Sequence, residues 1–375
     1  MTEYARNTAQ RTMLGSGAAA FELQRLLSTD PGRTVVWSPF SVGSALGLLW
    51  SGAVGDTAAQ LGAALAPGWA PHQLATMATA AVSEDPMPGA QLLAATMLWA
   101  DRQLPIRDAY RADAQGWPGG TVRTVDFAAD PAGARDVLND AVERATHGLI
   151  SQLLGPADVG ADTLAVLISA FWLRIRWERP FDQAATRSGD FETPRGTRDV
   201  PMMSDVRRVP YARIQRDGQW WSLVSLPAGG IDCDLVLPDR PEIRPTDPEL
   251  LAELRAASRP RMVDLRLPRT KVQSRLDLTE PLARLGIPNA FSDAAEFPRI
   301  SPVATKVDAV VHQAVLGIDE TGAEAAAATA ATMVLAAAVG HSEKPVAFHV
   351  NRPYLVVLRH RRTGVSYVSA LITEP

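Results

Sequence analysis

Few side chains in this 375-residue chain stand in a pattern that would carry out catalysis. Ser16 lies between glycines in "LGSGA" but lacks the G-x-S-x-G elbow that exposes a nucleophilic serine. Cys233 is the single cysteine, and its apolar, alternating surroundings predict a buried, inert thiol without a disulfide partner. The histidines show no metal-ligand spacing such as H-E-x-x-H; they are His72, His147, His312, His341, His349 and His360. We therefore predict that the chain is not an enzyme and uses neither a metal nor a cofactor.

The most unusual segment runs from Glu320 to Pro345 and consists almost entirely of small residues. Its alanines favour a helix, whereas Gly322, Gly340 and the threonines within it oppose one. On composition alone, a flexible low-complexity linker is at least as good an interpretation. A linker, however, needs a domain on both sides, and only 30 residues follow it. A long loop between two strands of a compact unit is usually functional, so we predict a functional loop over about 320–345.

Hydrophobic periodicity predicts the elements that would hold this loop. Helices are expected within 8–28, over Phe40–Ala53, where the pattern is apolar nearly all round, and over Pro131–Gly148. The apolar run 163–177 is rich in β-branched and aromatic residues and suits the centre of a sheet. Other strands are expected at 34–37, 91–99, 122–127, 219–227, 233–238, 262–278 and 309–320, with a hairpin over 348–372 that turns at Thr363–Gly364. No linker or repeat divides the chain, which we interpret as one domain over 1–375.

Composition sets further bounds. Hydrophobic residues make up 46% and charged residues 21% of the chain, a balance typical of globular proteins. The net charge of −4 predicts no bulk attraction to nucleic acid or to anionic membranes. No long apolar run predicts a membrane span, and the N-terminus has no apolar stretch typical of a signal peptide. We expect a cytoplasmic monomer, and release from the cell stays open as an alternative.

Seven segments in the same order resemble the serpin family. They are "VVWSPFSVGSALGLL", "LNDAVERATHGLISQLL", "LISAFWLRIRWERPF", "VPMM", "LDLTEPLARLGIPNAFSDAAEF", "VVHQAVLGIDETGAEAAAATA" and "FHVNRPYLVVLRHRRTGVSYVSALITEP". The resemblance implies an α+β serpin fold with three β-sheets, eight or nine helices and an exposed C-terminal reactive loop. It also implies a suicide inhibitor: a serine protease cleaves the loop and forms an acyl-enzyme, and the loop then inserts as a new central strand.

The resemblance also implies roles for individual residues. The reactive bond would be Ala336–Ala337, with Leu335, Val339 and Gly340 as alternatives because the loop is slightly longer than usual. The polar "shutter" beneath the sheet would comprise Ser38, Ser41, Ser169 and His312; Ser169 stands where the family usually has Asn, which predicts a rewired network. Trp177 and Arg269 would lie at the "breach", where the loop first enters, with Arg269 near Glu320. The hinge of the loop would comprise Glu320, Gly322, Ala323, Glu324, Ala325, Ala326, Ala327, Ala328 and Thr329, with Ala323 in place of the usual Thr.

Alternation along a strand tests whether this hinge is able to insert. One face would carry Ala323, Ala325, Ala327, Thr329 and Ala331, and the other Glu324, Ala326, Ala328, Ala330 and Thr332. We take the uncharged face as the buried one, since small side chains enter a sheet interior without an unpaired charge. The main alternative is a non-inhibitory serpin that acts as a binding or chaperone protein; such members tend to lose the small-residue hinge.

The loop also predicts the target. No Arg or Lys lies between Glu320 and Lys344, and every residue from Leu335 to Gly340 is small or aliphatic. An elastase-like or subtilisin-like protease is therefore expected, and trypsin is not. No Lys or Arg lies between Arg33 and Arg102, so we expect no heparin site at the family's helix D.

Overall fold

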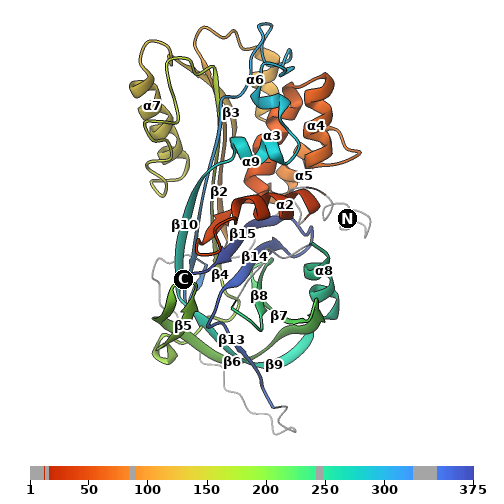
Figure 1. Cartoon of the computed structure of the whole chain (residues 1–375), viewed down its shortest axis with the longest axis vertical. Coiled ribbons are helices and arrows are strands. Elements are labelled where there is room, and N and C mark those ends of the chain that lie inside the picture. The colour runs from red at the N-terminus through yellow and green to blue at the C-terminus, as the bar shows by residue number, and fades with distance from the viewer. Residues whose placement is uncertain (1–11, 13–16, 84–89, 242–247, 324–343) are drawn as a thin grey trace.

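The computed structural model describes residues 12, 17–83, 90–241, 248–323 and 344–375. The molecule is elongated, with most helices at one end and a strongly curved sheet at the other (Figure 1). The described strands form two hydrogen-bonded sheets of six and nine strands. The helices in this part of the chain are α2 (Ala18–Leu27), α3 (Pro39–Gly52), α4 (Gly55–Leu65), α5 (Pro71–Ser83), α6 (Asp108–Ala114), α7 (Pro131–Ala145), α8 (Pro248–Ala257) and α9 (Thr279–Arg284).

The six-stranded sheet runs along the long axis of the molecule. Its strands, in spatial order, are β10 (Thr270–Asp277), β11 (Ala309–Ile318), β12 (Gly322–Ala323), β4 (Ala165–Arg176), β2 (Gln91–Asp101) and β3 (Gly120–Val125). The apolar run predicted for a sheet centre is β4, and its first nine residues are all buried. The sheet is mixed, because β4 is parallel to β11 but antiparallel to β2.

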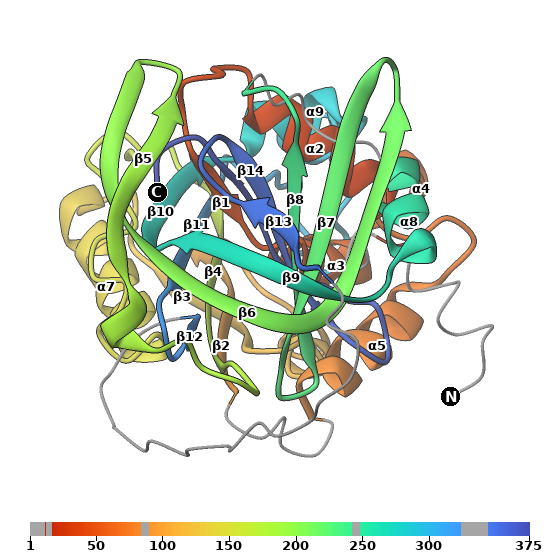
Figure 2. The same cartoon turned by 90° about the horizontal axis from the view of Figure 1, so that it is seen from below.

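The nine-stranded sheet curls around the opposite end. It contains β1 (Val35–Trp37), β15 (Ser366–Ile372), β14 (Tyr354–His360), β8 (Ile231–Pro238), β7 (Gln219–Ala228), β6 (Gly196–Arg216), β9 (Arg259–Pro268) and β13 (Val346–His349), with β5 (Arg187–Thr193) paired to β6. Figure 2 shows β6 passing from β5 on one side to β7 on the other. Because β6 is 21 residues long and continuous, it joins two of the three expected sheets into one, so the described strands form two hydrogen-bonded sheets.

Two hydrophobic clusters cover the two faces of the six-stranded sheet. The larger lies between this sheet, the nine-stranded sheet and α3, and it includes Leu167 and Phe171 of β4. The smaller lies under α7, on the other face, and includes Val166 and Ile168 of the same strand. Figure 1 shows α7 and α3 on opposite sides of the sheet. Burial on both faces explains why β4 reads as a continuous apolar run.

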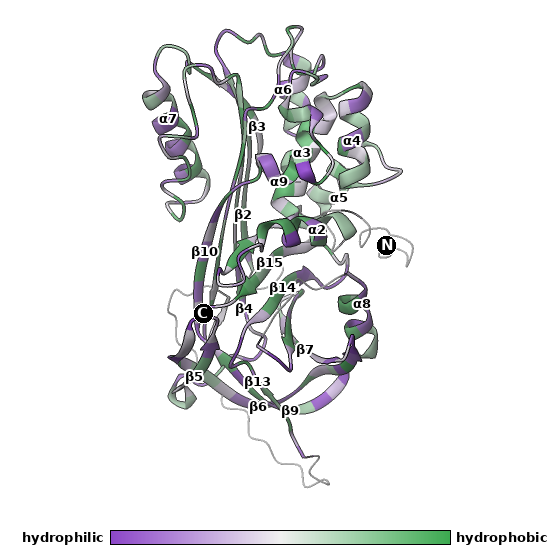
Figure 3. Cartoon of the chain, viewed as in Figure 1, coloured by the Kyte–Doolittle hydropathy of each residue, from purple (hydrophilic) through white to green (hydrophobic). Residues whose placement is uncertain are grey.

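The helices differ in how much of their surface is buried. Every residue of α3 except Ser51 is buried, as predicted from its apolar pattern. Hydrophilic and hydrophobic colours alternate along α7 in Figure 3, because this helix buries only the face towards the sheet. The helix predicted over Pro131–Gly148 ends at Ala145; His147 and Gly148 have φ angles of 53° and 81°, which a right-handed helix excludes.

Two segments that were each predicted as a single strand are each divided into two strands in the structure. The run 262–278 breaks at Arg269, where the chain leaves β9 in one sheet and enters β10 in the other. The run from Phe348 breaks before Pro353, which has no backbone N–H for a ladder, so β13 and β14 are separate. The first of these breaks places Arg269 at the junction of the two sheets.

Candidate functional site

The site lies where β4 and β11 separate at one end of the six-stranded sheet. The two strands pair directly, in parallel, from Ala309 opposite Val166 to Ala314 opposite Phe171. Beyond that point they part, and the two-residue strand β12 occupies the gap between them. Ala323 pairs with Ile318 of β11 and with Ile175 of β4, antiparallel to both. The first residues after β11 therefore turn back and enter the sheet as an additional strand.

A tight turn at 319–322 reverses the chain between β11 and β12. The Asp319 carboxylate accepts hydrogen bonds from the Thr321 N–H at 2.8 Å, the Thr321 hydroxyl at 2.7 Å and the Gly322 N–H at 3.1 Å. The Asp319 N–H donates to the Gly322 carbonyl at 2.8 Å. An aspartate that binds the backbone two residues further on is typical of such turns, and here it fixes where β12 begins.

Gly322 is required in this position by the close approach of β4. A Cβ atom there would lie 1.9 Å from the Ile175 carbonyl oxygen and 2.8 Å from the Arg176 Cα. Both are backbone atoms of a paired strand, so neither yields without disturbing the ladder. Glycine at the root of the hinge thus lets β12 fit between its neighbours.

Glu320 anchors the turn to the junction of the two sheets. Its side chain is 3% exposed and binds Arg269 Nη2 at 2.7 Å and Arg269 Nε at 2.8 Å, so the contact predicted between these residues is present. The Thr186 hydroxyl donates to the same carboxylate at 2.5 Å. Burial alone would raise the pKa of Glu320, but the hydrogen bonds from Arg269 and Thr186 outweigh it and hold that pKa below its usual value.

Trp177 contacts the turn through both its backbone and its side chain. The indole Nε1–H donates to the Asp319 carbonyl at 2.8 Å, and the Trp177 N–H donates to the Thr321 carbonyl at 3.0 Å. The Phe181 N–H binds the Glu320 carbonyl at 2.8 Å. The segment that follows β4 therefore holds the carbonyls of the turn, while Arg269 and Thr186 hold its carboxylate.

Ser38, Ser41, Ser169 and His312 form one buried polar cluster beneath the sheet. The Ser38 N–H donates to His312 Nε2 at 3.0 Å, so the ring carries its proton on Nδ1. Nδ1 lies 2.9 Å from the Ser169 carbonyl and 3.0 Å from Ser169 Oγ, which in turn lies 2.8 Å from Ser41 Oγ. Burial lowers the pKa of His312 to about 4, so the ring is neutral at pH 7.

This cluster joins β4 to β11 and both to α3. Ser169 and His312 are directly opposite each other in the parallel ladder. Ser38 is the N-cap of α3, and its hydroxyl accepts from the Ser41 N–H at 3.0 Å. The hydrogen bond between His312 and Ser169 therefore crosses the line along which a new strand would have to enter.

Comparison with known proteins identifies the family. The sequence model described as Serpin (serine protease inhibitor) matches residues 16–375. The chain belongs to the serpin family. It is 31% identical over 352 residues to the leukocyte elastase inhibitor of Bos taurus, which covers 90% of this chain and 92% of that protein. Its fold is similar to uncleaved ovalbumin, with a TM-score of 0.84, 22% identity and coverage of 98% of this chain and 100% of ovalbumin. It is equally similar to thyroxine-binding globulin in complex with thyroxine, with a TM-score of 0.85, 21% identity and full coverage of both chains.

Part of the predicted serpin site lies outside the described residues. These are the hinge positions from Glu324 to Thr329 and the reactive-bond candidates from Leu335 to Gly340. Only the backbone pairing of Ala323 is described. The roles assigned to the shutter and breach residues stay predictions, although the shutter residues contact one another and both breach residues contact the turn at 319–322.

Sequence reasoning missed Asp319, Thr186 and Phe181, which hold the turn. Asp-x-Thr-Gly is a turn signal that points to Asp319, whereas nothing local in the sequence marks Thr186. Within the described residues, no group of three His, Cys, Asp or Glu side chains stands in a position to hold a metal ion. No helix in that part of the chain is long and apolar enough to cross a membrane.

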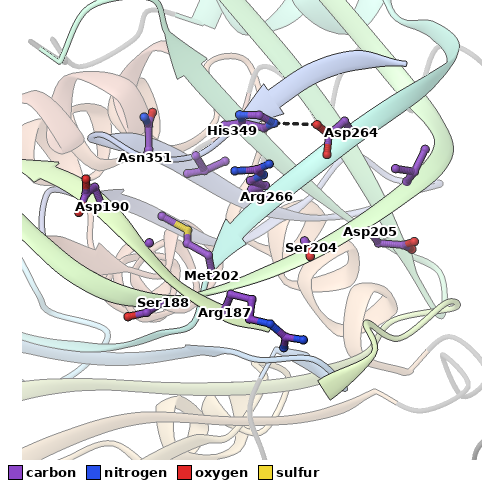
Figure 4. A pocket seen from close by; sticks show the side chains of 13 residues that line it. Arg187, Ser188, Asp190, Met202, Ser204, Asp205, Asp264, Arg266, His349 and Asn351 are labelled. Carbon is purple, nitrogen blue, oxygen red and sulfur yellow. Dashed lines mark hydrogen bonds and ion pairs between the residues drawn. The ribbon is translucent and has the colours of Figure 1, made fainter. Parts of the chain in front are cut away.

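A second concave surface lies on the nine-stranded sheet of this serpin. Its cavity, of about 530 Å³, is lined by residues of β5, β6, β9 and the segment 349–351. Figure 4 shows His349 and Asp264 facing each other across two of these strands, with His349 Nε2 2.9 Å from Asp264 Oδ2. No pattern in the sequence predicts this surface.

Proposed function

We propose that this serpin inhibits a serine protease as a suicide substrate. The family description and the name of its bovine relative both support inhibition of serine proteases. In the finer mechanism, the protease cleaves the reactive loop, which begins after Ala323, and forms an acyl-enzyme. The protease is trapped when the cleaved loop inserts between β4 and β11. We further propose that the protein acts as a monomer and without a cofactor.

The observation that carries this proposal is the register of β12. Continued without a slip, it would bring Ala325 opposite Leu316 and Leu173, and each later residue opposite the next pair. Leu316 and Leu173 belong to the large core, and both are at most 3% exposed. The residues directed to the core would therefore be Ala325, Ala327, Thr329 and Ala331, which are all small. This supports the choice of buried face made from the sequence alone.

The single charged residue of the inserted strand would lie on its outward face. Glu324 would lie opposite Arg174 of β4, on the face away from the large core. A carboxylate and a guanidinium directly opposite each other across two strands stabilise the pairing. The segment that would insert thus has its one charged residue directly opposite a cationic side chain.

The numbers of backbone hydrogen bonds formed and broken set the size of the free energy that drives insertion. The nine residues from Glu324 to Thr332 would gain roughly 18 backbone hydrogen bonds as a central strand and would break about six between β4 and β11. At ~1 kcal/mol net for each bond, insertion is worth on the order of 10 kcal/mol. Because a whole domain has a stability of about 5–15 kcal/mol, the uncleaved protein would be metastable.

We propose an elastase-like or subtilisin-like protease as the target. The candidate bonds between Leu335 and Gly340 offer only small or aliphatic side chains to the specificity pocket. A trypsin-type pocket would keep its buried carboxylate unpaired with any of them. Weaker action on chymotrypsin is expected through Leu335.

Electrophoresis under denaturing conditions tests the mechanism. Mixed with pancreatic elastase or subtilisin, the protein should form a complex that survives SDS, and mass spectrometry of the released fragment should locate the cut within Leu335–Gly340. Trypsin serves as the control and should form no such complex. A cut outside that window, or efficient trapping of trypsin, would contradict the target assignment.

A thermal melt separates an inhibitor from a non-inhibitory serpin. Cleavage near Ala336 should raise the melting temperature sharply, because the hinge then becomes a central strand. A cleaved protein that melts within a few degrees of the intact one would refute insertion and leave a binding or chaperone role as the better interpretation.

A further inference from the structure

The connection between α7 and β4 crosses the line along which the sheet would open. Residues 146–164 follow α7 and lie over the outer face of the sheet, where Ile150, Leu153 and Leu154 pack against residues of both β4 and β11. We call this segment the strap. An inserted strand would pass directly beneath it, because β4 and β11 are the strands that must part.

The middle of the strap is fixed to the half of the sheet that contains β2 and β4. Asn139 of α7 accepts hydrogen bonds from the Leu153 and Leu154 N–H groups at 3.0 and 2.8 Å, and its Nδ2 donates to the Leu154 carbonyl at 3.0 Å. Residues of α7 itself pack against β2 in the cluster on this face. The strap at 153–154 is therefore tied to α7 and, through it, to β2.

Arg275 ties the strap to the other half of the sheet, which contains β10 and β11. Arg275 belongs to β10, opposite Gln313 of β11, so it lies beyond the opening line. Its Nε donates to the Leu153 carbonyl at 2.5 Å, and its Nη2 forms an ion pair with Asp158. The same Asp158 oxygen accepts from the Gly155 N–H at 2.5 Å, which folds 153–158 around the guanidinium.

We propose that Arg275 and Asp158 form a latch across the six-stranded sheet that slows insertion of the reactive loop. A new strand widens the sheet by about 4.8 Å between β4 and β11. Asn139 and Arg275, on opposite sides of that gap, then no longer both reach residues 153–158 of the strap, so one set of bonds has to break. The proposal rests on the proposed function, since it concerns how fast the cleaved loop inserts.

The latch adjusts the outcome of each encounter with a protease. After acylation, insertion competes with hydrolysis of the acyl-enzyme, so a faster insertion traps more protease for each inhibitor consumed. The cost of a faster insertion is a native state that opens more readily without cleavage. The latch is 38% exposed at Arg275 and 14% exposed at Asp158, so its effect is modest, about fivefold in rate.

The test compares R275M, D158N and the conservative variant R275K with the wild-type protein, using elastase and subtilisin as probe proteases. R275M and D158N should form SDS-resistant complex about fivefold faster at saturating protease, and should lose activity about fivefold faster on storage at 37 °C. The second-order association rate should not change, because no latch residue belongs to the reactive loop. The double variant should be no faster than either single one, and R275K should fall between.

R135M is the matched control. Arg135 and Asp136 form an ion pair of 2.7 Å within α7, on one side of the opening line only. A rate in R275M and D158N within twofold of wild type, or an equal acceleration in R135M, would overturn the latch while the complex itself still forms. If the wild-type protein forms no complex and gains no stability on loop cleavage, the proposed function fails, and the latch fails with it.

Discussion

Replacing Ala325 with arginine should convert this serpin from an inhibitor into a substrate. The register of β12 would bring residue 325 of the inserted strand opposite Leu173 and Leu316, which are 3% and 1% exposed and face the large core. An arginine there would enter the sheet interior with no carboxylate opposite it. Burying an unpaired charge costs several kcal/mol, of the order of 3–5.

That cost sets the size of the effect. A barrier raised by about 3 kcal/mol slows insertion more than a hundredfold. Hydrolysis of the acyl-enzyme would then win, and the cleaved inhibitor would be released with active protease. The yield of SDS-resistant complex should fall below about a tenth of the wild-type yield, while the rate of loop cleavage stays similar.

Ala326 provides the matched control for the same substitution. The extended register would direct residue 326 of the inserted strand to the outer face, opposite Trp172 and the half-buried Val315, where a long arginine side chain would reach solvent. A326R should therefore keep most of the complex yield. Equal yields for the two variants, or a loss confined to A326R, would refute the register and with it the assignment of the buried face.

Three further predictions concern the site and its surroundings. Burial lowers the pKa of His312 to about 4 from an ordinary 6.5, so as pH falls the unfolded state binds a proton at this histidine before the folded state does. The free energy of unfolding should therefore fall by about 3 kcal/mol as pH drops from 6.5 to 4. This part of the pH dependence should be missing in H312Q. G322A should have a lower melting temperature than wild type, because the new Cβ would collide with the Ile175 carbonyl. A nonspecific protease should also cut the turn at 319–322 faster in this variant. An unchanged melting temperature would show that β12 shifts to accommodate the Cβ at little cost. Heparin should leave the inhibition rate unaltered, and a large, salt-sensitive acceleration would reveal a basic surface outside 34–101.

Periodicity predicted the elements best where burial is simplest. The strand β4 and the helix α3 are buried on all sides over most of their length, and their continuous apolar runs located them closely. The strands around Arg269 were merged because hydropathy continues through the point where the chain changes sheets. A change of partner leaves no trace in a pattern that records only burial.

The site was predictable only through the family resemblance. Ser169 and His312 are 143 residues apart in the sequence, and no local pattern relates them, yet they are opposite each other in the ladder. Arg269 was assigned to Glu320 by the same resemblance. Thr186 and Asn139 have no sequence signal, because a hydroxyl or amide that binds a distant residue looks the same in the sequence as one in water.

The inserted strand also predicts a specific role for Thr329, the one hydroxyl on its inward face. If the register of β12 were extended, residue 329 would lie between Ser169 and His312, whose direct hydrogen bond of 3.0 Å the new strand would separate. An alanine there would leave the buried Nδ1–H of His312 without a partner, at about 1–3 kcal/mol, whereas Ser169 Oγ keeps Ser41 Oγ. T329V, which keeps the shape but removes the hydroxyl, should therefore lower the unfolding free energy of the loop-cleaved form by that amount and leave the intact protein unaffected. T332V, directed to the opposite face, should change neither form. Equal stability of cleaved T329V and cleaved wild type in denaturant titrations would show that Thr329 does not reach the cluster, and that insertion follows another register or stops short of it.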